Sequence, residues 1–186
     1  MHVQTTNIRD VLILTPNVFI DDRGSFFESF NQKVFNDILL KYDNCMQNVT
    51  FVQDNHSTSK KQVLRGLHYQ VQKPQAKLVR VVKGSALDVV VDMRKHSPTL
   101  GKHIAVELSS KNQKQLWIPS GFAHGFLALS TEVEFLYKTT DYRYGEFERT
   151  LLWNDKDINI NWGIVNPILS DKDKVGIPFK QVIKEI

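Results

Sequence analysis

Short apolar segments that alternate with turn residues run through most of this chain of 186 residues. In residues 103–108, for example, Ile104, Val106 and Leu108 fall on one face of an extended strand. Gly84-Ser85 separates two such segments and has the composition of a hairpin turn. The pattern predicts strands at residues 11–14, 51–55, 63–70, 77–83, 86–93, 103–108, 116–118, 122–129, 133–140 and 150–153. Because helices do not alternate with these segments, we expect a mostly β fold, an antiparallel sandwich or barrel, formed by residues 1–186 as one domain.

Two segments have the pattern of short helices at the periphery of such a fold. Asn31 is suited to cap the first helix, because its side chain can accept a hydrogen bond from a backbone amide of the first turn. Apolar residues follow at helical spacing and predict a helix that covers the outside of a sheet; they are Val34, Phe35, Ile38, Leu39 and Tyr42. A second short helix is expected at residues 180–183.

The formal net charge of +4 is modest and spread along the chain. It favours anionic ligands, but neither a long basic run nor a nucleic-acid motif is present, so we expect no nucleic-acid partner. No apolar run is long enough to cross a bilayer, and the N-terminal residues lack the pattern of a signal peptide. The single cysteine, Cys45, excludes an internal disulfide and a cysteine-based zinc site, and we interpret it as an inert thiol. This cysteine usage suits a reducing compartment such as the cytoplasm.

The familiar phosphate-binding loops and the nucleophile elbow of serine hydrolases are absent. A phosphorylated ligand would therefore be held by Arg and Lys side chains. Polar residues instead gather in four clusters within the apolar strands, at residues 22–30, 53–57, 63–70 and 119–126. Because buried strands avoid polar groups that are neither satisfied nor used, these clusters are the candidate functional segments. A hydrogen-bonded core histidine is the competing interpretation of both His68 and His124.

Strict alternation along residues 63–70 raises a conflict, because it places Arg65 and His68 on opposite faces of the strand. Both side chains can face one pocket only if the strand contains an extra residue between them. Glycine within a strand often marks such a bulge, so we predict a β-bulge at Gly66.

Several of these segments, taken in order, resemble the dTDP-4-dehydrorhamnose 3,5-epimerase family. The resemblance extends from residue 22 to residue 173 and includes Gln53-Asp54-Asn55-His56-Ser57, Arg65-Gly66-Leu67-His68-Tyr69-Gln70, Lys77-Leu78-Val79-Arg80, Trp117-Ile118-Pro119-Ser120-Gly121-Phe122-Ala123-His124-Gly125-Phe126 and Phe135-Leu136-Tyr137-Lys138-Thr139-Thr140. It implies a cupin-like jelly-roll β-barrel, usually a homodimer, that inverts C3 and C5 of dTDP-4-dehydro-6-deoxy-D-glucose to give dTDP-4-dehydro-L-rhamnose. It also implies that no metal or redox cofactor is needed, in agreement with the absence of the His-x-His pair typical of metal-binding cupins.

The C4 ketone of such a substrate acidifies the hydrogens on C3 and C5. The reaction needs a base, a group that stabilises the enolate oxygen, and an acid on the opposite face of the ring. By resemblance, His68 is the base, and Asp173 holds its second ring nitrogen, with Asp171 as the second candidate. Tyr137 matches the proton donor and Lys77 the lysine near the oxyanion.

The resemblance also implies a set of substrate-binding residues around this centre. His124 matches a further histidine that contacts the substrate. The nucleotide and sugar would be held by Arg23, Glu28, Gln53, Asn55, Arg65, Glu148 and Lys172, with Phe26, Phe27 or Tyr142 stacked on thymine. Among these residues, Arg23 and Arg65 suit the diphosphate, because a guanidinium pairs with two phosphate oxygens at once.

Three alternatives remain open from the sequence. A relative that inverts only C3 or only C5 of a related 4-keto dTDP-sugar shares these motifs. A metal-dependent cupin oxygenase or isomerase would bind a metal through His68, His124 and a carboxylate. A non-catalytic protein that binds sugar nucleotides would use the same pocket without removing a proton.

Overall fold

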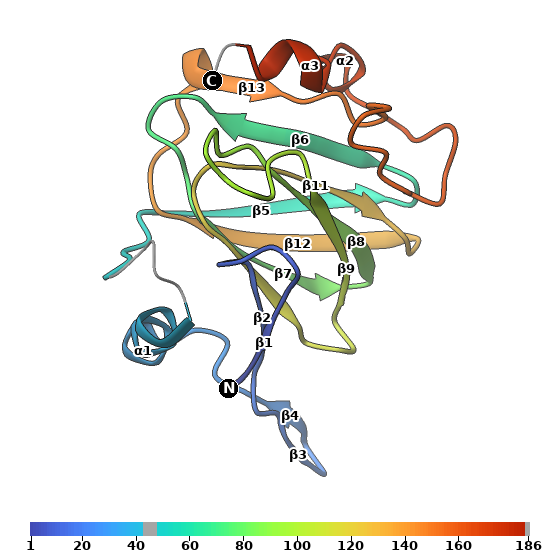
Figure 1. The fold of residues 1–186 in the computed structure, drawn as a ribbon. Coiled ribbons are helices and arrows are strands. Elements are labelled where there is room, and N and C mark those ends of the chain that lie inside the picture. The colour runs from blue at the N-terminus through green and yellow to red at the C-terminus, as the bar shows by residue number, and fades with distance from the viewer. Residues whose placement is uncertain (43–47, 185–186) are drawn as a thin grey trace.

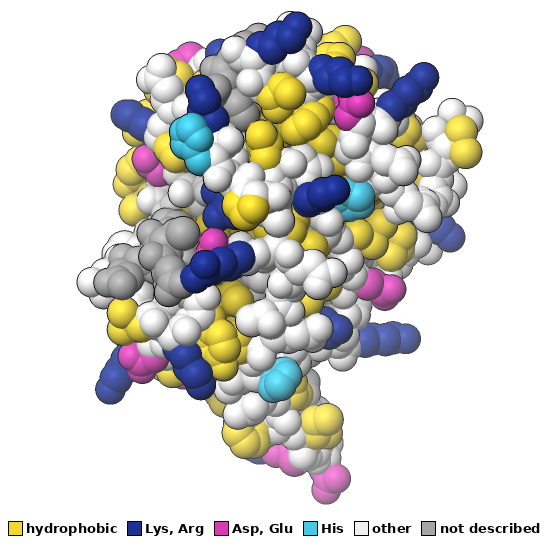
Figure 2. All heavy atoms as spheres, viewed as in Figure 1, with side chains coloured by type: hydrophobic (Ala, Val, Ile, Leu, Met, Phe, Trp, Pro, Cys, Tyr) yellow, Lys and Arg dark blue, Asp and Glu magenta, His cyan; other side chains and the backbone are white. Residues whose placement is uncertain are grey.

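A computed structural model of the chain describes residues 1–42 and 48–184 (Figure 1). Cys45, interpreted above as an inert thiol, lies outside the described residues. None of the described helices is long and apolar enough to cross a membrane. On the face seen in Figure 2, the Lys and Arg side chains are dispersed rather than gathered into one patch.

The described residues form a sandwich of two antiparallel sheets, as the sequence predicts (Figure 1). The larger sheet contains, in spatial order, β1 (His2–Thr5), β2 (Leu12–Thr15), β10 (Gln115–Ile118), β7 (Lys77–Lys83), β12 (Glu132–Thr139) and β5 (Gln53–Lys60). The smaller sheet contains β13 (Glu148–Thr150), β6 (Leu64–Gln70), β11 (Phe122–Ala128), β8 (Ser85–Asp92) and β9 (His103–Ser109). The mostly β, cupin-like prediction is confirmed.

The strand predictions differ from the structure mainly at polar segments. The predicted strand at 150–153 is wrong in position, because β13 ends at Thr150 and Leu151 continues only as an isolated bridge to Ile177. β5 is longer than predicted, since its polar residues alternate between solvent and the interior of the sandwich. The prediction missed β1 and the small hairpin of β3 (Phe19–Asp21) and β4 (Gly24–Phe26), whose residues are largely exposed and carry no clear apolar period.

Apolar side chains from both sheets fill one part of the space between them. Val79 of β7 and Val90 of β8 are fully buried in this core. Phe126 of β11 and Phe135 of β12 belong to opposite sheets, and their rings stack with centroids 4.2 Å apart. These two rings also border the polar cavity described below, so they form the boundary between the core and the site.

The outer face of each sheet is covered by a different segment. Helix α1 (Gln32–Tyr42) packs Phe35 and Leu39 against Trp117 of the larger sheet, and the side chain of Asn31 caps the helix by accepting from the amide of Val34 at 3.2 Å. This prediction is confirmed. The smaller sheet is covered by the C-terminal segment, which includes helices α2 (Asp171–Lys174) and α3 (Phe179–Val182). The short 3-10 helix η1 (Gly145–Phe147) precedes β13.

The bulge predicted in β6 is confirmed. His68 pairs with His124 of β11, whereas Arg65 pairs with Phe126, so β6 contains one more residue than β11 over this stretch. The extra residue reverses the alternation, and Arg65 and His68 therefore face the same cavity.

Two glycines allow β6 and β11 to approach closely at this bulge. Gly66 has a φ of +133°, a conformation that L side chains rarely adopt, and its peptide bond to Leu67 is cis. A Cβ on Gly66 would lie 2.5 Å from the Cα of Gly125, and a Cβ on Gly125 would lie 2.6 Å from the carbonyl oxygen of Arg65. Neither position has room for a side chain.

Gly66→Ala is therefore expected to lower the free energy of unfolding by roughly 2–4 kcal/mol, because the methyl group meets the Gly125 backbone and is disfavoured at positive φ. Urea denaturation followed by circular dichroism measures the change. Gly145→Ala is the control, since a Cβ at Gly145 has nothing within 4 Å. Equal denaturation midpoints for the two variants would show that the close approach is not required.

Candidate active site

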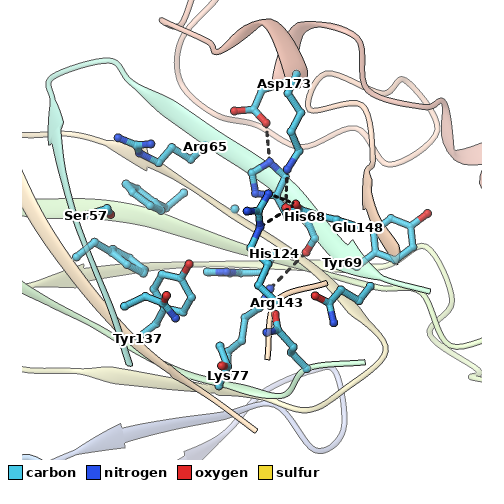
Figure 3. Close-up of a pocket in the computed structure, with 18 of the residues that line it drawn as sticks. Ser57, Arg65, His68, Tyr69, Lys77, His124, Tyr137, Arg143, Glu148 and Asp173 are labelled. Carbon is cyan, nitrogen blue, oxygen red and sulfur yellow. Dashed lines mark hydrogen bonds and ion pairs between the residues drawn. The ribbon is translucent and has the colours of Figure 1, made fainter. Parts of the chain in front are cut away.

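A polar cavity of about 300 Å³ lies between the two sheets (Figure 3). The larger sheet contributes Gln53, Asn55 and Ser57 of β5, Lys77 of β7, and Tyr137 and Thr139 of β12. The smaller sheet contributes Arg65, His68, Tyr69 and Gln70 of β6, His124, Gly125 and Phe126 of β11, and Glu148 of β13. Loops and the C-terminal segment add Gln75, Arg143, Ser170, Lys172 and Asp173.

Strand alternation explains why so many polar side chains reach this cavity. In β5, Gln53, Asn55 and Ser57 point inward, and the residues between them face outward. In β12, Tyr137 and Thr139 follow Phe135 at the same spacing, so the strand changes from apolar to polar on one face. On the inward face of β12, the apolar core is therefore followed directly by the polar residues of the cavity.

His68 is held by a buried carboxylate from the C-terminal segment. Its Nε2 lies 2.6 Å from Oδ1 of Asp173, and Oγ of Ser170 donates to the other carboxylate oxygen at 2.8 Å (Figure 3). Asp171, the second candidate, has a fully exposed side chain that pairs with Lys174 instead. Burial would raise the pKa of Asp173, but the hydrogen bonds from His68 and Ser170 outweigh it and hold that pKa below its usual range. Asp173 is thus an anion that fixes the orientation and tautomer of His68.

A second histidine of the cavity has the same kind of partner. Nε2 of His124 lies 2.9 Å and 3.1 Å from the two carboxylate oxygens of Asp88, which is fully buried on the neighbouring strand β8. The sequence prediction did not include Asp88, although an aspartate within the apolar run 86–93 is a signal of a buried, paired carboxylate. His124 is therefore a fixed side chain.

Lys77 places a buried cation in the wall of the cavity. The side chain is buried, and its Nζ lies 3.5 Å from the carbonyl oxygen of His68. Burial lowers its pKa to about 8, against the opposing influence of Glu148 and Asp88. An ammonium with this pKa is charged at neutral pH and can readily give up its proton.

Tyr137 lies on the wall opposite His68, because the two residues belong to different sheets (Figure 3). Burial is the main reason that its pKa is raised, and Glu148 adds to the effect. Arg143 and Arg65 act in the opposite direction without reversing it. The phenol is therefore protonated at neutral pH.

Charged side chains at the mouth of the cavity form a linked set. Glu148 accepts from Lys172 at 2.5 Å with one oxygen and from Arg143 at 2.8 Å with the other. Burial would raise the pKa of Glu148, but these two cations hold it below its usual range. Arg65 is held separately by Oγ of Ser59 and the carbonyl oxygen of Thr58.

The structure does not bring all the predicted residues into this cavity. Five of the substrate-binding candidates lie outside it within a single chain: Arg23, Phe26, Phe27, Glu28 and Tyr142. The side chain of Arg23 is 90% exposed on the β3–β4 hairpin, where it pairs with Asp21. Conversely, Gln75, Arg143 and Ser170 line the cavity without having been predicted, since nothing in their local pattern distinguishes them from ordinary loop residues. Gln70, which belongs to the candidate segment 63–70 but was not named for a role, lines the cavity as well.

The arrangement required by a metal-dependent cupin is not found in the part of the chain that the structure describes. No group of three or more His, Cys, Asp and Glu side chains there is placed to hold a metal ion. His68 and His124 instead have separate carboxylate partners, Asp173 and Asp88.

The low pKa of Lys77 leads to a pH-dependent stability. Between pH 8 and pH 10 the unfolded chain keeps the Lys77 proton and the folded protein has lost it, so the free energy of unfolding should rise with pH over this range. Urea denaturation at several pH values measures this change for the wild type and for Lys77→Met. As the pH rises, the free energy of unfolding of the wild type should increase relative to that of Lys77→Met. If the difference between the two free energies does not vary with pH, the lowered pKa is not that of Lys77.

Comparison with known proteins places the chain in a family. The profile of the family described as dTDP-4-dehydrorhamnose 3,5-epimerase matches residues 5–181. The enzyme of that name from Shigella flexneri is 56% identical over 96% of each chain. A crystal structure of dTDP-6-deoxy-D-glucose-3,5-epimerase from Legionella pneumophila, in complex with dTDP-4-keto-L-rhamnose, is 42% identical, with a TM-score of 0.92 over 99% of this chain and 95% of that one. A 3'-monoepimerase from Streptomyces bikiniensis, in complex with dTDP-quinovose, is 26% identical, with a TM-score of 0.87 over 97% and 89% of the two chains. The chain belongs to the dTDP-4-dehydrorhamnose 3,5-epimerase family.

Proposed function

We propose that the protein is an epimerase that inverts C3 and C5 of dTDP-4-dehydro-6-deoxy-D-glucose and gives dTDP-4-dehydro-L-rhamnose. The observation that carries the proposal is the placement of His68 and Tyr137 on opposite sheets across one cavity, with Asp173 behind the imidazole. An inversion needs a base on one face of the sugar and an acid on the other. Family membership and the complex of the Legionella relative support the same substrate.

In this mechanism His68 removes the proton next to the C4 ketone. Asp173 accepts the hydrogen bond from Nε2, which leaves Nδ1 unprotonated and able to take the proton. The imidazolium that results is stabilised by the ionised Asp173. Because C3 and C5 flank the same ketone, one base can serve both carbons if the ring shifts slightly between the two steps.

The electrons left at the carbon move to the ketone oxygen, and the Lys77 ammonium of the cavity is suited to stabilise the enolate. This ammonium is buried, so its charge is little screened by water. Tyr137 then donates a proton to the opposite face of the carbon, and its raised pKa keeps the phenol protonated until that step.

The charge of the cavity fits a nucleoside diphosphate sugar. Among the described lining residues, four are cations (Arg65, Lys77, Arg143 and Lys172) and two are carboxylates (Glu148 and Asp173). The excess of positive charge matches the doubly ionised diphosphate of the substrate. The remaining predicted binding residues, Gln53, Asn55 and His124, line the same cavity and are proposed to contact the sugar or nucleotide.

The β3–β4 hairpin supports a homodimer as the working state. It projects from the body of the chain, and hydrophobic side chains lie on its surface (Figures 1 and 2). Phe19, Ile20 and Phe26 are more than half exposed there. We propose that the hairpin packs on a second copy and carries Arg23, with the neighbouring Phe27 and Glu28, toward the partner's cavity.

We also propose that residues 1–186 act as one domain. The enzyme is proposed to work in the cytoplasm, a reducing compartment that suits a chain with a single cysteine.

The central test is solvent exchange. Incubation of the protein with dTDP-4-dehydro-6-deoxy-D-glucose in deuterated water should place deuterium at both C3 and C5, read by NMR. His68→Asn should slow labelling at both carbons by roughly 100-fold or more, because the base is lost. Tyr137→Phe should retain proton removal and lose inversion at one carbon or both.

His96→Asn is the matched control, since His96 is an exposed histidine outside the cavity. Labelling at one carbon only would replace the proposal by the monoepimerase activity that the Streptomyces relative is named for. Tight binding of dTDP with no labelling would indicate a non-catalytic binding protein. Unchanged labelling in His68→Asn would remove His68 from its role.

The dimer proposal is tested by mixing two inactive variants. Arg23→Gln impairs the cavity of its partner and His68→Asn impairs its own, so a mixed dimer contains one intact site. Co-expression should restore roughly a quarter of the wild-type activity, as random pairing predicts. Light scattering should report a dimer for each variant. A monomeric mass, or no recovery of activity in a verified mixed dimer, would refute the arrangement.

A further inference from the structure

Arg143 lines the cavity, and so far only its contribution to the positive charge of the cavity has been considered. It lies in the loop between β12 and η1, four residues after β12 ends at Thr139. Its backbone amide donates to Oε1 of Gln53 at 3.3 Å, and its side chain pairs with Glu148. Gln53 belongs to the larger sheet and Glu148 to the smaller one, so Arg143 bridges the two sheets at the mouth of the cavity.

The ion pair with Glu148 holds the guanidinium in place but engages only some of its N–H donors. Nε and Nη2 contact a single carboxylate oxygen, Oε2 of Glu148, at 3.1 Å and 2.8 Å. Nη1 is not part of this pair, and a guanidinium has more N–H donors than the pair engages. The Arg143 side chain is 65% exposed, so an anionic ligand that enters the cavity can reach it.

The two arginines that the sequence predicts for the diphosphate are held in different ways. Arg23 lies on the projecting hairpin and pairs with Asp21. Arg65 lines the cavity and bonds Ser59 and Thr58 through Nε and Nη2, so its Nη1 is outside these bonds, as is that of Arg143. Arg143 is thus a second arginine of the chain's own cavity with a donor available for an anionic ligand.

Arg143 shares its cavity with the proposed proton donor, because both Arg143 and Tyr137 line it. Burial raises the pKa of the Tyr137 phenol most, and Arg143 is one of the two cations that lower it. A phosphate attached to a sugar beside Tyr137 would therefore enter the cavity that the guanidinium borders.

We propose that Arg143 is a substrate-binding residue that pairs with the diphosphate of the dTDP-sugar. The inference rests on the proposed function and adds a diphosphate contact to it. Glu148 keeps the guanidinium at the mouth in the free protein, and Lys172, which pairs with the other oxygen of Glu148, neutralises that carboxylate when Arg143 turns to the phosphate.

The test compares ligands that differ only in phosphate. Calorimetry would measure the binding of thymidine, thymidine monophosphate and dTDP to the wild type, Arg143→Gln and Arg143→Lys. Arg143→Gln should weaken dTDP about tenfold or more, the effect of losing a charge-assisted hydrogen bond, and should change thymidine binding by less than about twofold. Arg143→Lys should fall between the wild type and Arg143→Gln, because it keeps the charge and loses the fork. In the epimerase reaction KM should rise with kcat changed by less than about threefold.

Arg9→Gln is the matched control, because Arg9 is an exposed arginine that pairs with an aspartate away from the cavity. An equal loss of thymidine and dTDP affinity in Arg143→Gln would assign the side chain to the base and overturn the diphosphate contact. Unchanged dTDP affinity would overturn it as well. Both results leave the proposed function intact if the wild type still exchanges deuterium at C3 and C5, whereas a wild type that neither binds dTDP nor exchanges would remove the function itself.

Discussion

The close backbone contact between Gly66 and Gly125 determines the geometry on which the active site depends. With no side chain at either position, β6 can bulge directly beside β11. The bulge adds one residue between Arg65 and His68, and a strand with one extra residue turns the following side chains to the other face. His68 consequently enters the cavity while Leu67 is fully buried against the C-terminal segment. A substitution that closed the bulge would misplace the base without touching it.

The same dependence on distant backbone applies to the carboxylate behind the base. Asp173 lies 105 residues from His68 in the sequence and reaches it from a helix of four residues. Such a short helix has little stability of its own. Its position depends on the C-terminal segment, which packs on the outer face of the smaller sheet, and on Ser170, whose hydroxyl bonds both the amide and the carboxylate of Asp173. Apolar packing on one side of the sheet thus orients the imidazole on the other side.

The sequence could predict the elements whose side chains follow a clear period. The helix after Asn31 has apolar residues at helical spacing, and strands such as β9 alternate apolar and polar residues, so local pattern was sufficient. The β3–β4 hairpin and most of β5 could not be predicted in this way, because their exposed or cavity-facing residues are polar or irregular. Within the site, motifs marked His68 and His124, and the bulge at Gly66 followed from a conflict of alternation. Asp88 and Arg143 depend on contacts with His124 and Gln53, which lie 36 and 90 residues away from them in the sequence.

The distribution of charge then explains how a base and a cation can work side by side. Asp173 lies behind His68 and Asp88 behind His124, so each imidazole has a buried carboxylate on the side away from the substrate. These anions favour the imidazolium that forms when the proton is removed, while Lys77 favours the enolate that forms in the same step. The two charges created by the reaction therefore each appear beside a fixed group of opposite sign, and the cations at the mouth remain available for the charge that the substrate brings with it.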